Sequence, residues 1–98
     1  LYISIGDNTP PWQANGFPPM DEREGRRIYD AQRTAANTHD PRGKVLRIKP
    51  LAKGGFSIPD GNLFDKEGKQ GLPEIYTMGC RNPWRMSIDK RRNVIYWG

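Results

Sequence analysis

A shortage of aliphatic side chains most constrains what this chain can fold into. Leu, Ile, Val and Phe together account for 18 of the 98 residues, whereas Gly and Pro account for 20. Such a composition, with a net charge of +5, is typical of disordered chains, but three Trp, four Tyr and three Phe indicate that part of the chain is packed. The single cysteine, Cys80, cannot form an internal disulfide, and no Cys/His cluster has zinc spacing. The fold must therefore be stabilised by packing, with few residues to fill a core.

Both ends of the chain consist of strand-like apolar runs, at residues 1–5 and 94–97. Domains usually have polar, exposed termini. We therefore expect residues 1–98 to be part of a single domain, with both termini internal to a longer chain. No apolar run reaches the roughly 18 to 20 residues of a membrane span, and the first residues lack the basic region and apolar core of a signal peptide.

Hydrophobic periodicity predicts short strands and one helix. The predicted strands cover residues 1–5, 44–49, 74–78, 84–89 and 94–97. The last two form a hairpin around a turn at residues 90–93. Asp21 followed by Glu24 matches a capping box and predicts a helix over residues 21–36, in a long loop between strands. With no βαβ alternation and no Gly-rich phosphate loop, the sequence predicts an all-β fold. If the chain is one part of a closed ring of sheets such as a β-propeller, its small number of core residues is explained, because the rest of the ring would complete the core.

Four blocks of the sequence, in order, resemble the glucose/sorbosone dehydrogenase family, the soluble quinoprotein sugar dehydrogenases. The most extensive block is residues 72–89 (LPEIYTMGCRNPWRMSID). The others are residues 1–8 (LYISIGDN), 42–48 (RGKVLRI) and 58–64 (IPDGNLF). The resemblance implies a six-bladed β-propeller, of which this chain supplies about one and a half to two blades, and propeller blades bury their faces against neighbouring blades.

The resemblance also implies a chemistry. Active members hold pyrroloquinoline quinone (PQQ) and calcium, and they oxidise a sugar hydroxyl by hydride transfer to the quinone while a His acts as base. Arg81 and Asn82 match the family's Arg-Asn pair that contacts the quinone oxygens. The family's catalytic His and calcium-binding stretch match positions outside this chain, so we expect no catalytic residue and no metal ligand within it, and the segment alone should be inactive. Family members of this kind are bacterial periplasmic or secreted proteins, which is the location that we expect.

Other interpretations of the same residues remain open. Arg81 and Asn82 can be a purely structural pair, in which Arg ties loop carbonyls together and Asn adopts a turn before Pro83. The whole protein can then be a non-catalytic propeller that binds a carbohydrate or a partner protein. His39 lies in the loop before the second strand and is not expected to be the base. Cys80 stands where relatives commonly carry Leu or His.

Charged and aromatic residues outside these blocks suggest no further site. The basic clusters at residues 26–27 and 90–92 are expected to be solvated faces rather than a nucleic-acid footprint, since acidic residues are interspersed throughout. The acidic residues follow no calcium-loop spacing; they include Asp7, Asp21, Glu22, Asp40 and Asp60. Three aromatic residues are candidates for stacking on a sugar but are expected to be buried instead; they are Trp12, Phe17 and Trp84. The expected partners are a sugar substrate and the rest of the propeller.

Overall fold

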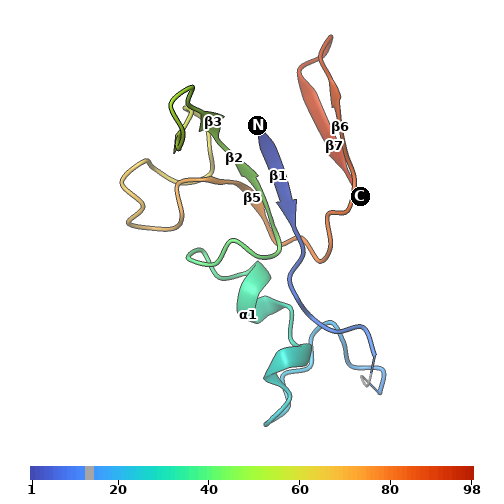
Figure 1. The fold of residues 1–98 in the computed structure, drawn as a ribbon. Helices are drawn as coiled ribbons and strands as arrows, with labels where there is room; N and C mark the ends of the chain where they lie inside the picture. Colours follow the sequence, from blue (N-terminus) through green and yellow to red (C-terminus); the bar gives the residue numbers. More distant parts are fainter. Residues whose placement is uncertain (13–14) are drawn as a thin grey trace.

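A three-stranded antiparallel sheet forms the centre of the computed structural model, which describes residues 1–12 and 15–98 (Figure 1). Its strands are β1 (Tyr2–Ile5), β2 (Lys44–Arg47) and β5 (Ile75–Met78), in the order β1-β2-β5. Tyr2 pairs with Arg47 and Ile5 with Lys44, while Lys44 pairs with Met78 on the other side, and a bulge interrupts β2 between Val45 and Leu46. Because β1 and β5 both run antiparallel to β2, their carboxyl ends lie at the same edge of the sheet.

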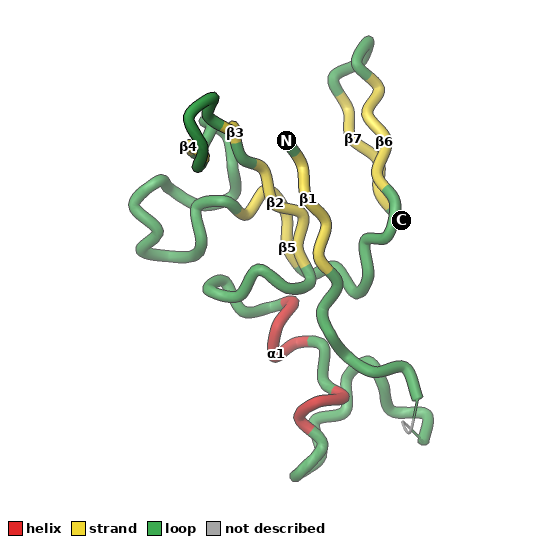
Figure 2. Tube along the Cα trace, in the orientation of Figure 1, coloured by secondary structure: helices red, strands yellow, loops and turns green. Residues whose placement is uncertain are grey.

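Two small antiparallel pairs flank this sheet (Figure 2). The hairpin of β6 (Met86–Asp89) and β7 (Val94–Trp97) has the predicted turn between its strands, and the Asp89 carboxylate accepts the backbone N–H groups of Arg91 and Arg92 there. The pair β3 (Lys49–Pro50) and β4 (Phe56–Ser57) lies at the start of the Gly- and Pro-rich residues 50–73. β3 begins at the last residue of the predicted strand 44–49, and no strand was predicted at β4. Asn62 fastens that stretch to the sheet by donating to the carbonyls of Arg47 and Pro73.

The predicted helix over residues 21–36 is wrong over most of its length. The structure has a 3₁₀ turn, η1 (Arg27–Tyr29), and a four-residue helix, α1 (Gln32–Ala35). Asp21 does not cap a helix, because its buried carboxylate binds the Arg23 and Arg26 side chains. Gly25 has a φ of +74°, which no α-helix contains. The prediction of one short helix within a long loop between strands is confirmed.

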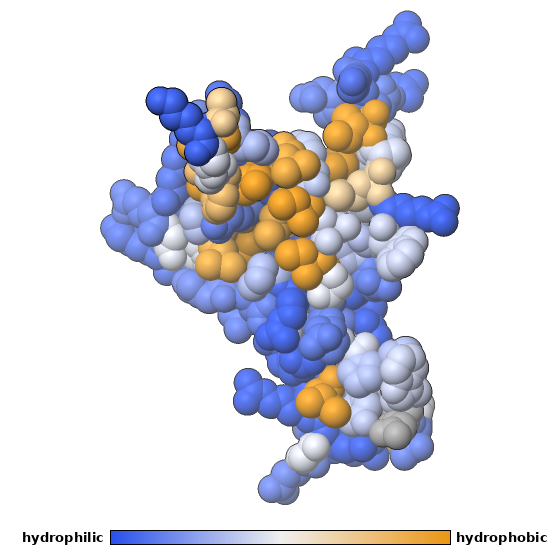
Figure 3. All heavy atoms as spheres, in the orientation of Figure 1, coloured by the Kyte–Doolittle hydropathy of each residue, from blue (hydrophilic) through white to orange (hydrophobic). Residues whose placement is uncertain are grey.

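The core is as thin as the composition indicates. Among the described residues, five hydrophobic side chains are buried: Tyr29, Ala31, Ala35, Val45 and Ile75. Large apolar side chains remain exposed on the three-stranded sheet and on the β6–β7 hairpin, including Ile3 on β1 and Ile88 and Tyr96 on the hairpin. Figure 3 shows apolar surface gathered over the three-stranded sheet and over the part of the hairpin closest to it. The radius of gyration, 15.3 Å, exceeds the value of about 13 Å for a compact 100-residue domain. The sheets therefore do not close on each other.

Small antiparallel sheets with little helix confirm the all-β class and agree with a part of a β-propeller. β1 pairs with β2 and β7 pairs with β6, so the first and last strands are not partners. Within residues 1–12 and 15–98, no helix has the length and apolar character needed to cross a membrane.

Candidate functional site

Asp7 and Arg81 meet at the edge of the sheet where β1 and β5 both end. Asp7 follows β1 by two residues and Arg81 follows β5 by three. The Arg81 Nη1 atom lies 2.6 Å from Asp7 Oδ1, and Arg81 Nη2 donates to the Thr9 carbonyl at 2.8 Å. The backbone N–H of Asp7 also donates to the Arg81 carbonyl at 3.0 Å. Two segments more than 70 residues apart in the sequence are therefore joined through side chain and backbone together.

The Asp7 carboxylate is fully buried, whereas the Arg81 side chain is 39% exposed. Asp7 Oδ1 also accepts the Thr9 backbone N–H at 2.9 Å, which is the pattern of an Asx turn. Asp7 Oδ2 and Thr9 Oγ1 are buried and have no hydrogen-bond partner among the described residues. Both residues line an open hollow of about 440 Å³ together with Arg81 and Asn82. The lining of the hollow thus combines a cation, a carboxylate, a hydroxyl and an amide.

Asn82 is exposed beside this hollow and faces Gly6. A Cβ atom at Gly6 would lie 2.8 Å from Asn82 Oδ1, so the absence of a side chain at Gly6 makes room for the amide. A second open hollow, of about 550 Å³, is also lined by Arg81 and Asn82, together with Cys80 and Trp97 among others. Arg81 and Asn82 therefore line both hollows.

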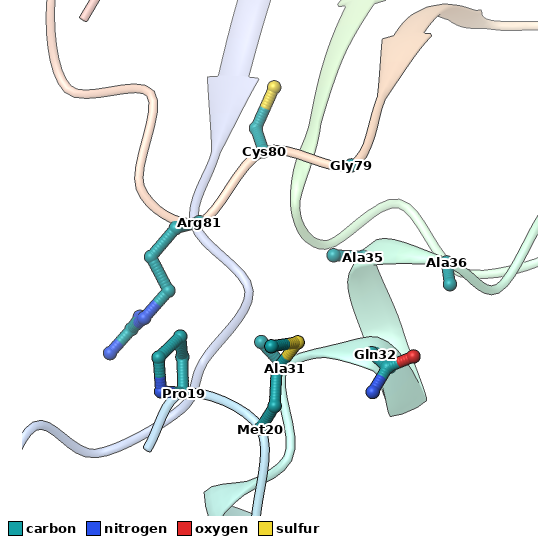
Figure 4. A pocket seen from close by; sticks show the side chains of 9 residues that line it. All are labelled: Pro19, Met20, Ala31, Gln32, Ala35, Ala36, Gly79, Cys80 and Arg81. Atoms are coloured by element: carbon teal, nitrogen blue, oxygen red, sulfur yellow. The ribbon is translucent and has the colours of Figure 1, made fainter. Parts of the chain in front are cut away.

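A third hollow, of about 220 Å³ and mainly apolar, lies between Arg81 and helix α1 (Figure 4). The Arg81 side chain runs toward Pro19, and Met20 and Ala31 line the same space, while the Cys80 side chain points the opposite way. Burial raises the pKa of the Cys80 thiol.

Helix α1 is held against this edge of the sheet by Lys44 and Gly43. The fully buried Lys44 ammonium donates to the carbonyls of Thr34, Ala35 and Arg42 at 2.7, 3.0 and 2.8 Å. Burial lowers the pKa of the Lys44 ammonium. The Thr34 hydroxyl in turn donates to the Asp7 carbonyl at 2.7 Å. A continuous polar chain therefore runs from β2 through α1 to Asp7 and Arg81.

Most of the other candidate residues that the sequence suggested lie apart from Arg81 and Asn82 in the structure. His39 is exposed in its loop, with Nδ1 3.1 Å from Thr38 Oγ1, and lies outside the Arg81 hollows. The acidic residues are distributed among different cations: Asp21 pairs with Arg23 and Arg26, Asp40 with Arg42, and Asp60 with Lys66. No three His, Cys, Asp or Glu side chains of the described ranges gather into a possible metal site. Trp12, Phe17 and Trp84 are exposed rather than buried as expected, with the Arg23 guanidinium 3.7 Å from the Phe17 ring centre.

Sequence reasoning missed the part that Asp7 plays in the site. The Gly6-Asp7-Asn8 sequence indicates only a turn, and the signal available was an Asp directly after a strand of one family-like block. The burial of Lys44 was also missed. The signal available was its position in a strand, between Gly43 and the apolar pair Val45 and Leu46.

Replacing Asp40 with Asn is expected to lower the free energy of unfolding by about 1 kcal/mol near neutral pH. The Arg42 guanidinium, bound to the carboxylate, lowers the pKa of Asp40 below its ordinary value of 3.8. A carboxyl whose pKa is lower in the folded state stabilises the protein above the unfolded-state pKa, and that stabilisation is lost as the pH falls through the folded-state pKa. In chemical denaturation of the full protein, the difference between wild type and Asp40→Asn should shrink below about pH 4. A difference that stays constant down to about pH 2 would contradict the role of this pair.

Known proteins resemble this chain in sequence. The chain is 35% identical over 91 residues to the HIPL2 protein of Arabidopsis thaliana, which covers 80% of the chain and 13% of the relative. It is 37% identical over 75 residues to the HIPL1 protein of the same plant, covering 64% of the chain and 11% of that relative. The chain thus spans roughly an eighth of the length of these relatives, and no solved structure matches it significantly. The profile of the Glucose / Sorbosone dehydrogenase family matches residues 1–97, and the chain therefore belongs to the glucose/sorbosone dehydrogenase family.

Proposed function

We propose that this chain is a segment of a PQQ-dependent sugar dehydrogenase-like oxidoreductase, in which Arg81 and Asn82 contact the oxygens of the quinone. The observation that carries the proposal is that the Arg81 guanidinium uses only some of its N–H groups in hydrogen bonds to the described residues. Of its five N–H groups, hydrogen bonds to Asp7 and Thr9 occupy two. The others are available beside hollows that Asn82 shares.

The residues present fit such a ligand. Guanidinium is a permanent planar donor, and an adjacent amide donates to a second oxygen, so the pair stabilises negative charge on two neighbouring carbonyl oxygens. The side-chain-free Gly6 gives the Asn82 amide its space. When bound, the quinone supplies the acceptor for a hydride from a sugar carbon. In this proposal Arg81 and Asn82 bind and orient, while the base that takes the hydroxyl proton, the calcium ligands and the remaining blades come from outside residues 1–98.

The whole protein is then a periplasmic or secreted enzyme that oxidises an aldose- or sorbosone-type sugar. Residues 1–98 alone are expected to be inactive, because the apolar faces of both main sheets are left exposed and the base is elsewhere.

A second candidate function is a propeller that binds a carbohydrate or a partner protein without redox chemistry. The ion pair with Asp7 and the bond to the Thr9 carbonyl favour it, since a purely structural arginine makes the same contacts.

Calorimetry and dye reduction on the full-length protein with PQQ, calcium and a panel of sugars separate the two candidates. We expect PQQ to bind and sugars to drive dye reduction, with Arg81→Ala lowering kcat by about 10²-fold, as for the loss of an oxyanion donor. Arg85→Ala is the matched control, because Arg85 is exposed nearby and hydrogen-bonds Gly98 through its backbone, which the substitution keeps. It should leave both readouts unchanged. Absence of PQQ binding to a folded full-length protein would retire the enzymatic proposal in favour of the binding module.

A further inference from the structure

We propose that the loop between β1 and β2 carries a binding site for a tetrahedral oxyanion of the sulfate or phosphate type. The loop lies beyond the end of the three-stranded sheet and contains η1 and α1 (Figure 1). It holds an open hollow of about 320 Å³, lined by residues of η1, of α1 and of the turn before β2: Arg27, Ile28, Arg33, Asn37, Asp40 and Arg42. None of these residues lines the hollows that Arg81 and Asn82 share, so the site goes beyond the proposed function and does not rest on it.

The lining of this hollow carries an excess of positive charge. It contains three guanidinium groups and one carboxylate, which leaves a formal net charge of +2. The Asp40 carboxylate is already bound by Arg42, whose Nε and Nη2 atoms lie 2.9 and 2.6 Å from its two oxygens. Arg27 and Arg33 have no carboxylate partner among the described residues. Two cations in the hollow therefore lack a counter-ion from this part of the chain.

Two of the three guanidinium groups are held in place before a ligand arrives. Arg33 Nη2 donates to the Asn8 carbonyl at 2.9 Å and Arg33 Nε is buried, so Nη1 is its remaining terminal nitrogen. Arg42 is fixed through Nε and Nη2 on Asp40, which leaves its own Nη1 unused. Oriented donors lose little side-chain entropy on binding. Arg27 is exposed, so it is free to close on an anion from the solvent side.

The remaining donors and acceptors of the lining select the kind of ligand. Asn37 Oδ1 accepts the His39 backbone N–H at 3.0 Å, so the Asn37 NH₂ group adds a neutral donor. The positive charge disfavours a metal cation, and a neutral sugar would leave the two unpaired cations without a counter-ion. Guanidinium groups bind oxyanions through paired N–H groups. A tetrahedral oxyanion presents oxygens in several directions, and donors from four different side chains surround this hollow.

Calorimetric titration of the full-length protein with sodium sulfate tests the proposal, with sodium chloride at equal ionic strength as the reference. We expect sulfate to bind and Arg27→Gln to weaken its binding about tenfold, the effect of losing one hydrogen bond to a charged group. Arg85→Gln is the matched control, because it removes the same charge from an exposed side chain outside the hollow. It should leave the affinity unchanged. Equal weakening by the two substitutions, an unchanged affinity in Arg27→Gln, or a wild-type protein that binds sulfate no better than chloride would overturn the proposal.

A second titration distinguishes two sources of the anion, because glucose 6-sulfate carries the same group as an ester. Tighter binding of the ester than of inorganic sulfate, lost in Arg27→Gln, identifies a sulfated saccharide as the ligand, whereas equal or weaker binding identifies the free ion. Folded Arg81→Ala protein should keep the wild-type affinity for sulfate, since Arg81 does not line the hollow. Loss of sulfate binding in this variant would place the anion at Arg81 and refute the site. A full-length protein that binds sulfate but not PQQ would refute the proposed function and leave the anion site intact.

Discussion

Replacing Gly43 with Ala should lower the free energy of unfolding of the full-length protein by about 4 kcal/mol. Gly43 has a φ of +67°, where a side chain is disfavoured. An added Cβ would also lie 2.6 Å from Ala35 Cβ, 2.7 Å from Ala35 Cα and 2.7 Å from the Cys80 carbonyl oxygen. Two of these three atoms are backbone, so relief requires α1 to move away from the sheet, and with it Thr34, which binds Asp7.

Gly25→Ala is the matched control for the Gly43 substitution. Gly25 has a similar φ of +74°, but nothing lies within 4 Å of an added Cβ there. The control therefore measures the backbone cost alone, about 1 kcal/mol. Urea denaturation of both variants isolates the steric cost at Gly43 as the difference. Equal destabilisation by the two substitutions would contradict the close contact of Gly43 with Ala35 of α1 and with the Cys80 carbonyl.

Replacing Lys44 with Met should lower the free energy of unfolding by about 1 to 3 kcal/mol. Methionine retains most of the aliphatic volume but cannot donate, so the carbonyls of Thr34, Ala35 and Arg42 lose a shared buried donor. The Thr34 and Ala35 carbonyls keep the backbone N–H groups of Asn37 and Gly79 as donors. The main cost is therefore the loss of the donor to the partly buried Arg42 carbonyl, about 1 to 3 kcal/mol. Helix α1 is only four residues long, and no helix of that length is stable without tertiary contacts.

The exposed Lys53 supplies the control, since Lys53→Met removes a charge without removing a buried donor. Its effect should stay within about 0.5 kcal/mol. Loss of α1 in Lys44→Met should also raise the rate of amide hydrogen exchange at Ala35 and Ala36, whose N–H groups donate to Ala31 and Gln32. Wild-type exchange at these amides in Lys44→Met would show that other contacts hold the helix.

The hairpin illustrates what local sequence determines well. Met86 and Ile88 alternate with polar residues, four polar residues that end in Asn93 follow, and a second apolar run returns. The structure contains these strands in the register Met86–Trp97 to Asp89–Val94. A hairpin joins neighbouring segments, so its pairing partners can be found within 12 residues. The helix prediction failed for the opposite reason. The capping-box pattern assumed that the Asp21 carboxylate would bind backbone N–H groups of a helix that starts there, whereas it binds the Arg23 N–H and the Arg23 and Arg26 guanidinium groups within a folded loop.

The sequence by itself determined the all-β class, the five main strands, the thin core and, through four ordered blocks, the family to which the chain belongs. These features depend on periodicity, turn residues and composition, which are read within a few residues of each position. Only the tertiary structure decided that Arg81 pairs with Asp7, and that a buried Lys44 fastens α1 beside them. Such contacts arise because β1 and β5 run in the same direction on either side of β2, which brings the residues after each strand to one edge across more than 70 positions of sequence.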